Sequence, residues 1–461
     1  MQRRNGMQQL ICVYWASAVA ASAQTLTTLH SFTGQPDGQT PYTGVAMSQA
    51  QDGSLYGTTI AGGTNGYGTV FGITPAGKLT LYSFDSSNAG YPDAGPALGT
   101  DGYLYGTADG YFGGLLNDGR VYSLAVGNGT FTVLHNFDSS DGRTPDGPLA
   151  LAPDDTYYGT AGYGGPLNNG DVFSITSHGE FKVLHAFNGT DGSLPQGGAL
   201  LLGPGPNQAL FGVTNYGGAF GLGTIYAIES TGAFKSVYSF DGTHGSYPTG
   251  TLVLANDGRA YGTTNGGGTS GNGTVFQISS MGVATVLHSF TGTEGESPAA
   301  GLTLGSDGKL YGTTNAGGAN GDGTIFSITT GGAFVKLYDF DGTHGSVPNY
   351  LTQHTNGILY GTTMNGGASN LGTVFSFDVG LGPFVTFVLN RGQSGAIAQI
   401  LGTGLTGATA VTFNGVPAAS FSAFSDSYMT ATVPSGATSG RVQVTTPGGT
   451  LTSNQSFLVE P

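Results

Sequence analysis

The sequence predicts an all-β protein, a seven-bladed β-propeller followed by a small immunoglobulin-like β-sandwich. The first observation is repetition: Tyr-Gly-Thr-Thr stands at residues 56–59, 261–264, 311–314 and 360–363, with related copies beginning at residues 105, 158 and 211. The second is composition, because the 461 residues include 85 Gly, 26 Phe and 23 Tyr, which indicates strands joined by tight turns. The copies are spaced 49 to 53 residues apart, close to the length of a propeller blade.

Residues 301–350 illustrate the expected unit of four strands. The segments GLTLGS and KLYGTT read as strands joined by a turn at Asp307-Gly308. A loop rich in Gly and Asn leads to GTIFSIT, and Gly331-Gly332 turns the chain into FVKLYDF. A link containing a proline then leads to the next unit. Proline lacks an N–H and cannot donate a hydrogen bond within a sheet, so it is tolerated in the link. Tyr and Phe repeated in every unit are expected to fill the space between stacked sheets.

The units are offset, so that the chain begins with a fourth strand at Leu26–Phe32, before any complete unit. The last unit stops after its third strand, Gly372–Phe377. We therefore expect the N-terminal strand to complete the last blade, which would hide the sheet edges that an open array exposes. We expect a monomer, with the propeller over residues 24–380.

The first 23 residues have the features of a secretory signal peptide. Arg3 and Arg4 precede a short apolar run from Leu10 to Ala20, and Ala21-Ser22-Ala23 forms a small-residue cleavage site before Gln24. The run is too short for a stable membrane anchor, and a buried N-terminal strand is the alternative reading. Cleavage would yield a secreted chain without Cys or Trp, because Cys12 and Trp15 are the only ones.

The last segment, residues 381–461, differs from the repeats. Alternating strands separated by turns at Asn414-Gly415 and Gly448-Gly449 predict a small β-sandwich.

Both regions resemble known families. Over residues 26–377, the succession LYGTT, GG, GTVF, LYSF, DG and P resembles the GloVer tandem-repeat proteins of bacteria, which implies secretion and a repeat fold but no chemistry. The C-terminal segments VTFNGVPA, ATVPSGATSG and VTTPGG resemble the IPT/TIG immunoglobulin-like domain, although Asn390-Arg391 stand where that family has a proline. This second resemblance implies a spacer or binding module without catalytic residues.

One face of the propeller is expected to carry the binding site, because the long loops after the second strands and the links after the fourth strands lie there. Most loops are small and polar, but those of adjacent units carry aromatic residues. The candidate ligand-binding residues are Tyr67, Tyr111, Phe112, Tyr163, Tyr216 and Phe220. The alternatives are that these loops pack on one another, or that the C-terminal domain docks there.

The chemistry-bearing residues favour binding over catalysis. Carboxylates look spread rather than paired, and Glu294 with Glu296 is weak as an acid pair. No nucleophile motif, phosphate loop or metal-ligand spacing stands out, so we expect no cofactor and no metal site, with calcium binding by the Asp/Asn/Gly-rich loops left open. The formal net charge of −15 excludes nucleic acid as a partner.

The expected function is a secreted, non-catalytic binding or cell-surface interaction protein, with an extracellular glycan or protein as its ligand. An extracellular hydrolase or lyase acting on polysaccharide is the alternative. The two are distinguished by whether several carboxylates converge at one end of the central channel.

Overall fold

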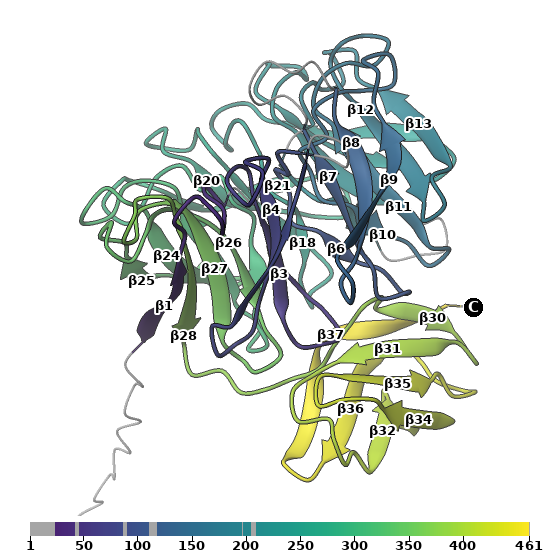
Figure 1. The fold of residues 1–461 in the computed structure, drawn as a ribbon. Coiled ribbons are helices and arrows are strands. Elements are labelled where there is room, and N and C mark those ends of the chain that lie inside the picture. Colours follow the sequence, from purple (N-terminus) through teal and green to yellow (C-terminus); the bar gives the residue numbers. More distant parts are fainter. Residues whose placement is uncertain are drawn as a thin grey trace, which may run out of the picture.

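The structure, a computed structural model, describes residues 24–41, 46–85, 90–109, 118–195, 197–203 and 209–460. The predicted signal peptide, residues 1–23, lies outside them. The described residues form β-strands and turns without a helix (Figure 1). Between Thr25 and Asp378 they build seven successive four-stranded antiparallel sheets in a propeller-like arrangement, and two further sheets follow. The predicted all-β class is therefore confirmed.

The sheets follow the chain order. Sheets 1 and 2 contain β2 (Ser48–Gln49), β3 (Leu55–Thr59), β4 (Thr69–Ile73), β5 (Leu79–Ser83), β6 (Ala97–Leu98), β7 (Leu104–Ala108), β8 (Arg120–Ala125) and β9 (Thr130–Asn136). Sheets 3 and 4 contain β10 (Ala150–Leu151), β11 (Thr156–Ala161), β12 (Asp171–Thr176), β13 (Phe181–Ala186), β14 (Leu201–Leu202), β15 (Leu210–Thr214), β16 (Thr224–Ile228) and β17 (Phe234–Ser239). Sheets 5 and 6 contain β18 (Val253–Leu254), β19 (Ala260–Thr264), β20 (Thr274–Ile278), β21 (Ala284–Ser289), β22 (Thr303–Leu304), β23 (Leu310–Thr314), β24 (Thr324–Ile328) and β25 (Phe334–Asp339). Sheet 7 contains β26 (Ser346–Gln353), β27 (Leu359–Asn365), β28 (Thr373–Asp378) and β1 (Thr25–Ser31).

The second and third strands of each unit form the core. Every residue of β23 and β24 is buried, because these strands are covered by neighbouring sheets on both faces. The repeated Gly of the second strand makes room for the repeated Phe of the third strand: a Cβ on Gly312 would lie 2.5 Å from Cζ of Phe326. This glycine therefore marks a close approach between adjacent strands. Phe326 in turn packs in one cluster with Tyr261 and Phe290 of the preceding sheet.

The N-terminal strand occupies the fourth position of the last sheet. β1 pairs antiparallel with β28, and Leu26 faces Phe377 in the register. The N–H of Phe32 donates to the carbonyl of Gly372 at 3.0 Å, as Phe84 does to Gly68 within sheet 1. The predicted pairing between the two ends of the repeat region is therefore present, and Figure 1 shows β1 alongside β28.

The links between sheets share one backbone conformation. The residue before each linker proline has φ between 53° and 57°, in the left-handed region that residues other than glycine rarely adopt. These residues are Thr40, Tyr91, Thr144, Leu194, Tyr247, Ser297 and Val347. Hydrogen bonds on both sides hold the conformation: Tyr91, for example, donates to the carbonyl of Tyr67 at 2.9 Å and accepts from Asp109 at 3.1 Å. Each link is thus fixed against the loop before it and the sheet after it.

The C-terminal region has its own core and packs against the repeats. Its first sheet contains β29 (Thr386–Phe387), β31 (Ile397–Leu401), β34 (Ser420–Ala423) and β35 (Tyr428–Thr432). Its second sheet contains β30 (Arg391–Gln393), β32 (Ala410–Phe413), β33 (Val416–Pro417), β36 (Gly440–Thr446) and β37 (Gly449–Glu460). Buried residues from Val385 to Phe457 form one hydrophobic cluster between them.

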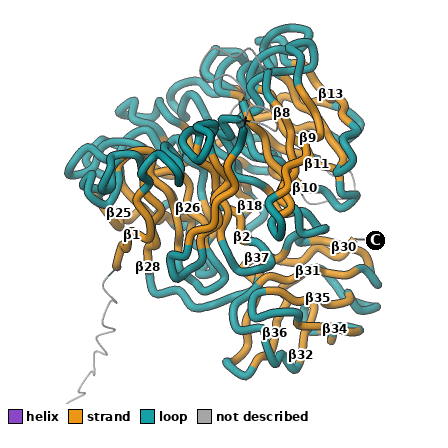
Figure 2. Tube along the Cα trace, viewed as in Figure 1, coloured by secondary structure: helices purple, strands orange, loops and turns teal. Residues whose placement is uncertain are grey.

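This region docks on the hairpins that join first to second strands, which we call the hairpin face. The amide of Gln399 donates to the carbonyl of Thr100 at 2.7 Å, and the hydroxyl of Ser427 donates to the carbonyl of Gln51 at the same distance. The loops after the second strands and the links after the fourth strands form the opposite side, the loop face. Figure 2 shows these loops gathered away from the C-terminal region.

Candidate functional site

The loop face exposes three of the six predicted aromatic residues. The exposed fractions are 39% for Tyr163, 46% for Tyr216 and 62% for Phe220. Tyr163 follows β11, whereas Tyr216 and Phe220 follow β15. Tyr67 follows β3 and is only partly exposed. The other two predicted residues, Tyr111 and Phe112, lie outside the described residues.

Tyr163 and Tyr216 occupy the same position in successive units. Each forms an isolated β-bridge with a link residue, Tyr163 with Arg143 and Tyr216 with Ser193. In the repeat units that form sheets 1, 5 and 6, the bridging residues at this position are Ala61, Gly266 and Ala316. Because a small residue is sufficient for the backbone bridge, the tyrosine rings are additions that the fold does not require.

Residues of the links support these rings. The ring of Tyr67 lies 5.7 Å from that of Tyr91, and Tyr216 lies 5.2 Å from Tyr247. The guanidinium carbon of Arg143 lies 5.4 Å from the ring centre of Tyr163, within the range of a cation–π contact. The alternative in which the C-terminal domain covers this face is wrong, because the domain docks on the hairpin face.

A group of carboxylates lies on the same face, and the sequence reasoning did not find it. Asp93 and Asp146 each follow a linker proline, and Asp109 follows β7. Burial raises the pKa of Asp93 well above its usual range, and the charges of Asp109 and Asp146 raise it further. Burial also raises the pKa of Asp109, while a hydrogen bond with Thr144 and the charge of Arg143 oppose that rise. The prediction that carboxylates are spread rather than paired is therefore wrong for these three.

The carboxylates and the aromatic residues form one continuous group, the acid–aromatic cluster. We define it as Tyr67, Tyr91, Asp93, Asp109, Arg143, Tyr163 and Asp146. The backbone of Asp109 bonds to Tyr91, which contacts Tyr67, and Arg143 joins Asp109 to Tyr163. The cluster thus spans the links and loops of sheets 1, 2 and 3, and it combines ring faces with two acids, Asp93 and Asp109, whose pKa is raised by burial.

A signal for the cluster was present in the sequence. The residue after the linker proline is Asp in two units only; the corresponding residues elsewhere are Tyr42, Gln196, Thr249, Ala299 and Asn349. Asp109 stands where units 4, 5 and 6 have Asn215, Asn265 and Asn315. These differences between units at polar positions are of the same kind as the differences that single out the aromatic loops.

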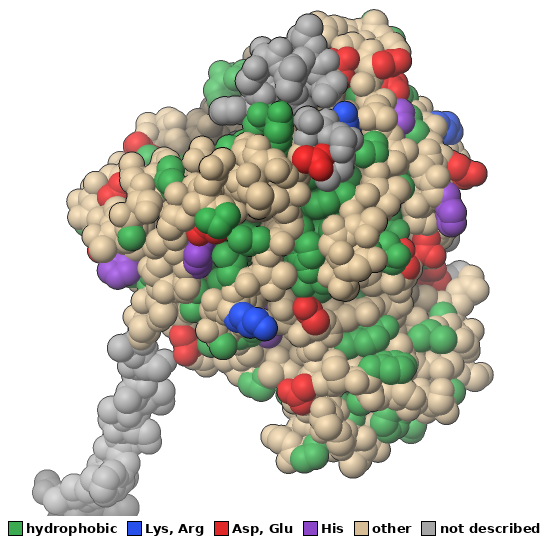
Figure 3. All heavy atoms as spheres, viewed as in Figure 1, with side chains coloured by type: hydrophobic (Ala, Val, Ile, Leu, Met, Phe, Trp, Pro, Cys, Tyr) green, Lys and Arg blue, Asp and Glu red, His purple; other side chains and the backbone are tan. Residues whose placement is uncertain are grey.

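Other titratable groups serve the fold. Glu294 accepts hydrogen bonds from Thr291 and pairs with His288 at 3.4 Å, which caps a link. His135 lies parallel to Phe181 with ring centres 3.7 Å apart and bonds to Asp141. Within the described ranges, no group of three or more His, Cys, Asp or Glu side chains is arranged to hold a metal ion. Figure 3 shows how sparse charged side chains are on the face in view.

Comparison with known proteins identifies the family. The pattern of the Gloeobacter/Verrucomicrobia repeat matches residues 16–205 and 196–423, so the chain belongs to this repeat family. No curated protein sequence shows significant similarity to the chain. In the described part of the chain, no helix is long and apolar enough to cross a membrane.

Similarity to solved structures is confined to the fold. A fungal alcohol oxidase of the AA5 family, solved in complex with copper, aligns with a TM-score of 0.51 at 16% identity, covering 92% of this chain and 98% of that one. The extracellular domain of a hybrid two component system from B. thetaiotaomicron aligns with a TM-score of 0.50 at 10% identity, covering 90% and 52%. TolB from Acinetobacter baumannii aligns at 17% identity and a TM-score of 0.38, and the chain spans 58% of its length.

Proposed function

We propose that the protein is a secreted binding protein whose seven sheets are the blades of a closed propeller. The pairing of β1 with β28 supports closure, because it gives the last sheet its fourth strand from the start of the chain. The two sheets of the C-terminal region, with their shared core, support an IPT/TIG-type immunoglobulin-like sandwich over residues 381–461. Residues 1–23 are its signal peptide.

The proposed ligand is an extracellular glycan, bound on the loop face by Tyr163, Tyr216 and Phe220. The observation that carries this proposal is the exposure of these rings at or beside positions where the fold needs only a small residue. Ring faces offer apolar area at low entropic cost, and polar neighbours can bond to sugar hydroxyl groups. Tyr67, Tyr111 and Phe112 are proposed to extend the same surface, and a protein ligand is the other partner that such a surface suits.

The test is a glycan array probed with the secreted protein and with a Tyr163→Ala, Tyr216→Ala double variant. The double variant should lose binding while its melting temperature stays close to that of the parent. Tyr103→Ala is the matched control, because Tyr103 is 43% exposed but lies on the hairpin face, and it should bind as the parent does. Equal loss in the control, or unchanged binding in the double variant, would contradict this assignment.

A second candidate, a hydrolase or lyase acting on polysaccharide, is favoured by the acid–aromatic cluster. Asp93, with its strongly raised pKa, suits a proton donor, and Asp109, whose pKa burial raises against the opposing charge of Arg143, is the candidate for the second carboxyl group. A screen of polysaccharide substrates would compare the parent with Asp93→Asn and Asp109→Asn. Turnover lost in both variants with binding retained would favour the enzyme; binding without turnover in the parent would favour the first function.

The proposed localisation has a separate test. N-terminal sequencing of exported protein should begin at Gln24, after the small-residue site at residues 21–23. An exported chain that retains Met1 would show that the N-terminal segment is not removed.

A further inference from the structure

A cavity of about 460 Å³ lies between the repeats and the C-terminal region. Its walls come from the first strands of several sheets, including β2, β6, β10, β14 and β26, and from residues 386–391 of the C-terminal region. We call it the inner chamber. Its volume is typical of small-molecule sites, and it lies on the side of the repeats opposite the acid–aromatic cluster.

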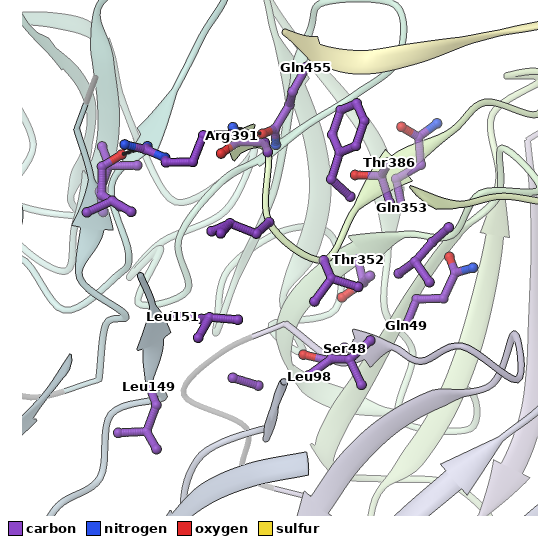
Figure 4. A pocket seen from close by; sticks show the side chains of 18 residues that line it. Ser48, Gln49, Leu98, Leu149, Leu151, Thr352, Gln353, Thr386, Arg391 and Gln455 are labelled. Carbon is purple, nitrogen blue, oxygen red and sulfur yellow. Dashed lines mark hydrogen bonds between the residues drawn. The ribbon is translucent and has the colours of Figure 1, made fainter. Parts of the chain in front are cut away.

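The inner chamber has one apolar wall. Leucine side chains of sheets 2, 3 and 4 line it, and Figure 4 shows Leu98, Leu149 and Leu151 on one side of the space. Leu201 and Leu202 continue this wall along β14. Replacing water beside these leucine side chains with an apolar group lowers the free energy, because apolar surface is removed from water.

The polar side chains on the facing wall are already engaged. The amide of Gln49 donates to Thr355 and accepts from its N–H, at 2.9 and 3.0 Å. The amide of Gln353 bonds to Ser306 and to the carbonyl of Gly357. These groups hold the hairpins together, so they leave little hydrogen-bonding capacity for a bound molecule.

Arg391 is the exception, and it is the only charged residue among the described residues that line the chamber. Its side chain is 2% exposed, and its two terminal nitrogens donate to the carbonyls of Gly203 and Leu202. Its Nε is buried and has no hydrogen-bond partner among the described residues. Among the residues that the structure describes, the nearest carboxylate is that of Glu460, at 3.9 Å, which is a long separation for a buried cation. A buried guanidinium with a free donor and a distant counter-ion favours an anionic ligand.

We propose that the inner chamber binds a small organic carboxylate with an apolar body. The carboxylate would accept from Nε of Arg391, and the apolar body would lie against the leucine wall. The site is independent of the glycan surface, because it involves the hairpin face and the C-terminal region. Variants at Tyr163 and Tyr216 should therefore leave it unchanged.

Calorimetric titration of the full secreted chain with octanoate, 1-octanol and acetate tests the proposal. Octanoate should bind most tightly, because 1-octanol lacks the charge and acetate lacks the apolar body. Octanoate that fails to bind at millimolar concentration, or binds no better than 1-octanol, would overturn it.

Two variants locate the binding. Leu151→Phe should fill part of the chamber and weaken octanoate binding by about tenfold or more, whereas Leu254→Phe, the same position of β18 outside the chamber, should not. Glu460→Gln removes the competing carboxylate and should tighten binding by about threefold or more, which a purely structural role would not produce. Octanoate affinity unchanged by both Leu151→Phe and Glu460→Gln would place binding elsewhere and refute the proposal.

Discussion

Asp171 pairs with Ala161 across β11 and β12, at the position where five other sheets pair two threonines. In those sheets the two hydroxyl oxygens lie 2.8 to 2.9 Å apart and are buried. Asp171 is fully buried, and neither carboxyl oxygen has a hydrogen-bond partner among the described residues. Burial, with a further contribution from the charge of Asp141, raises the pKa of Asp171 to about 8. Sheet 3 therefore carries a neutral acid where five other sheets carry a hydrogen-bonded pair of threonines.

This gives a prediction about pH. Because the folded pKa of Asp171 exceeds the unfolded value of 3.8, its contribution to stability is full below pH 3.8 and is lost as pH rises through about 8. Over that interval it should lower the free energy of unfolding by about 1.4 kcal/mol per pH unit. Denaturant unfolding at pH 5 and pH 8 should show a smaller loss of stability for Asp171→Asn than for the parent. An identical loss in both proteins would show that Asp171 does not titrate in this range.

Closure by the N-terminal strand predicts the effect of truncating Phe32. Phe32 is fully buried and its ring lies 5.4 Å from Phe71 of sheet 1. Phe32→Ala should cost about 3–5 kcal/mol of stability, similar to Phe240→Ala within the continuous sheet 4. Thermal unfolding of the two variants makes the comparison. A much smaller effect at Phe32 would favour an open array with a dispensable first strand.

The glycine of the second strand should not tolerate a methyl group. In Gly312→Ala the new Cβ would lie 2.5 Å from Phe326, which must move within a fully packed core, so we expect a loss of about 1–3 kcal/mol. Gly331→Ala is the matched control, because the nearest atom would be 3.8 Å away and the backbone is unstrained. Denaturant midpoints should separate the two variants clearly, and equal midpoints would contradict the steric explanation.

The C-terminal region should fold by itself. Its hydrophobic cluster is drawn wholly from residues between Val385 and Phe457, and its strands pair only among themselves. A fragment of residues 381–461 should show a strand-rich circular dichroism spectrum and a cooperative thermal transition. A disordered fragment would show instead that contacts with the hairpin face are required for folding.

The repeat made much of the fold predictable from the sequence. A residue type that returns every 49 to 53 residues reports the same environment each time, so Gly312 and Phe326 could be placed in adjacent strands. The same logic predicted the pairing of β1 with β28, since one strand was surplus at one end and missing at the other.

The position of the C-terminal region could not be predicted in this way. It depends on single contacts such as Gln399 with Thr100, which occur once and have no periodic signal. The candidate site was predicted only in part for a related reason. Aromatic residues in loops attract attention by their type, whereas Asp93 and Asp109 are ordinary loop residues whose significance comes from burial and mutual repulsion.

The pairing of β1 with β28 also constrains when the protein can finish folding. The first strand to leave the ribosome must wait for residues 373–378, so the contact that completes sheet 7 joins segments separated by almost the whole repeat region. Closing so long a loop carries an entropic cost and slows folding, whereas each internal sheet needs only its own unit. Until that contact forms, β28 presents an unpaired edge to any other strand. The interval before closure is therefore when incomplete chains are most prone to exchange β1 between two copies.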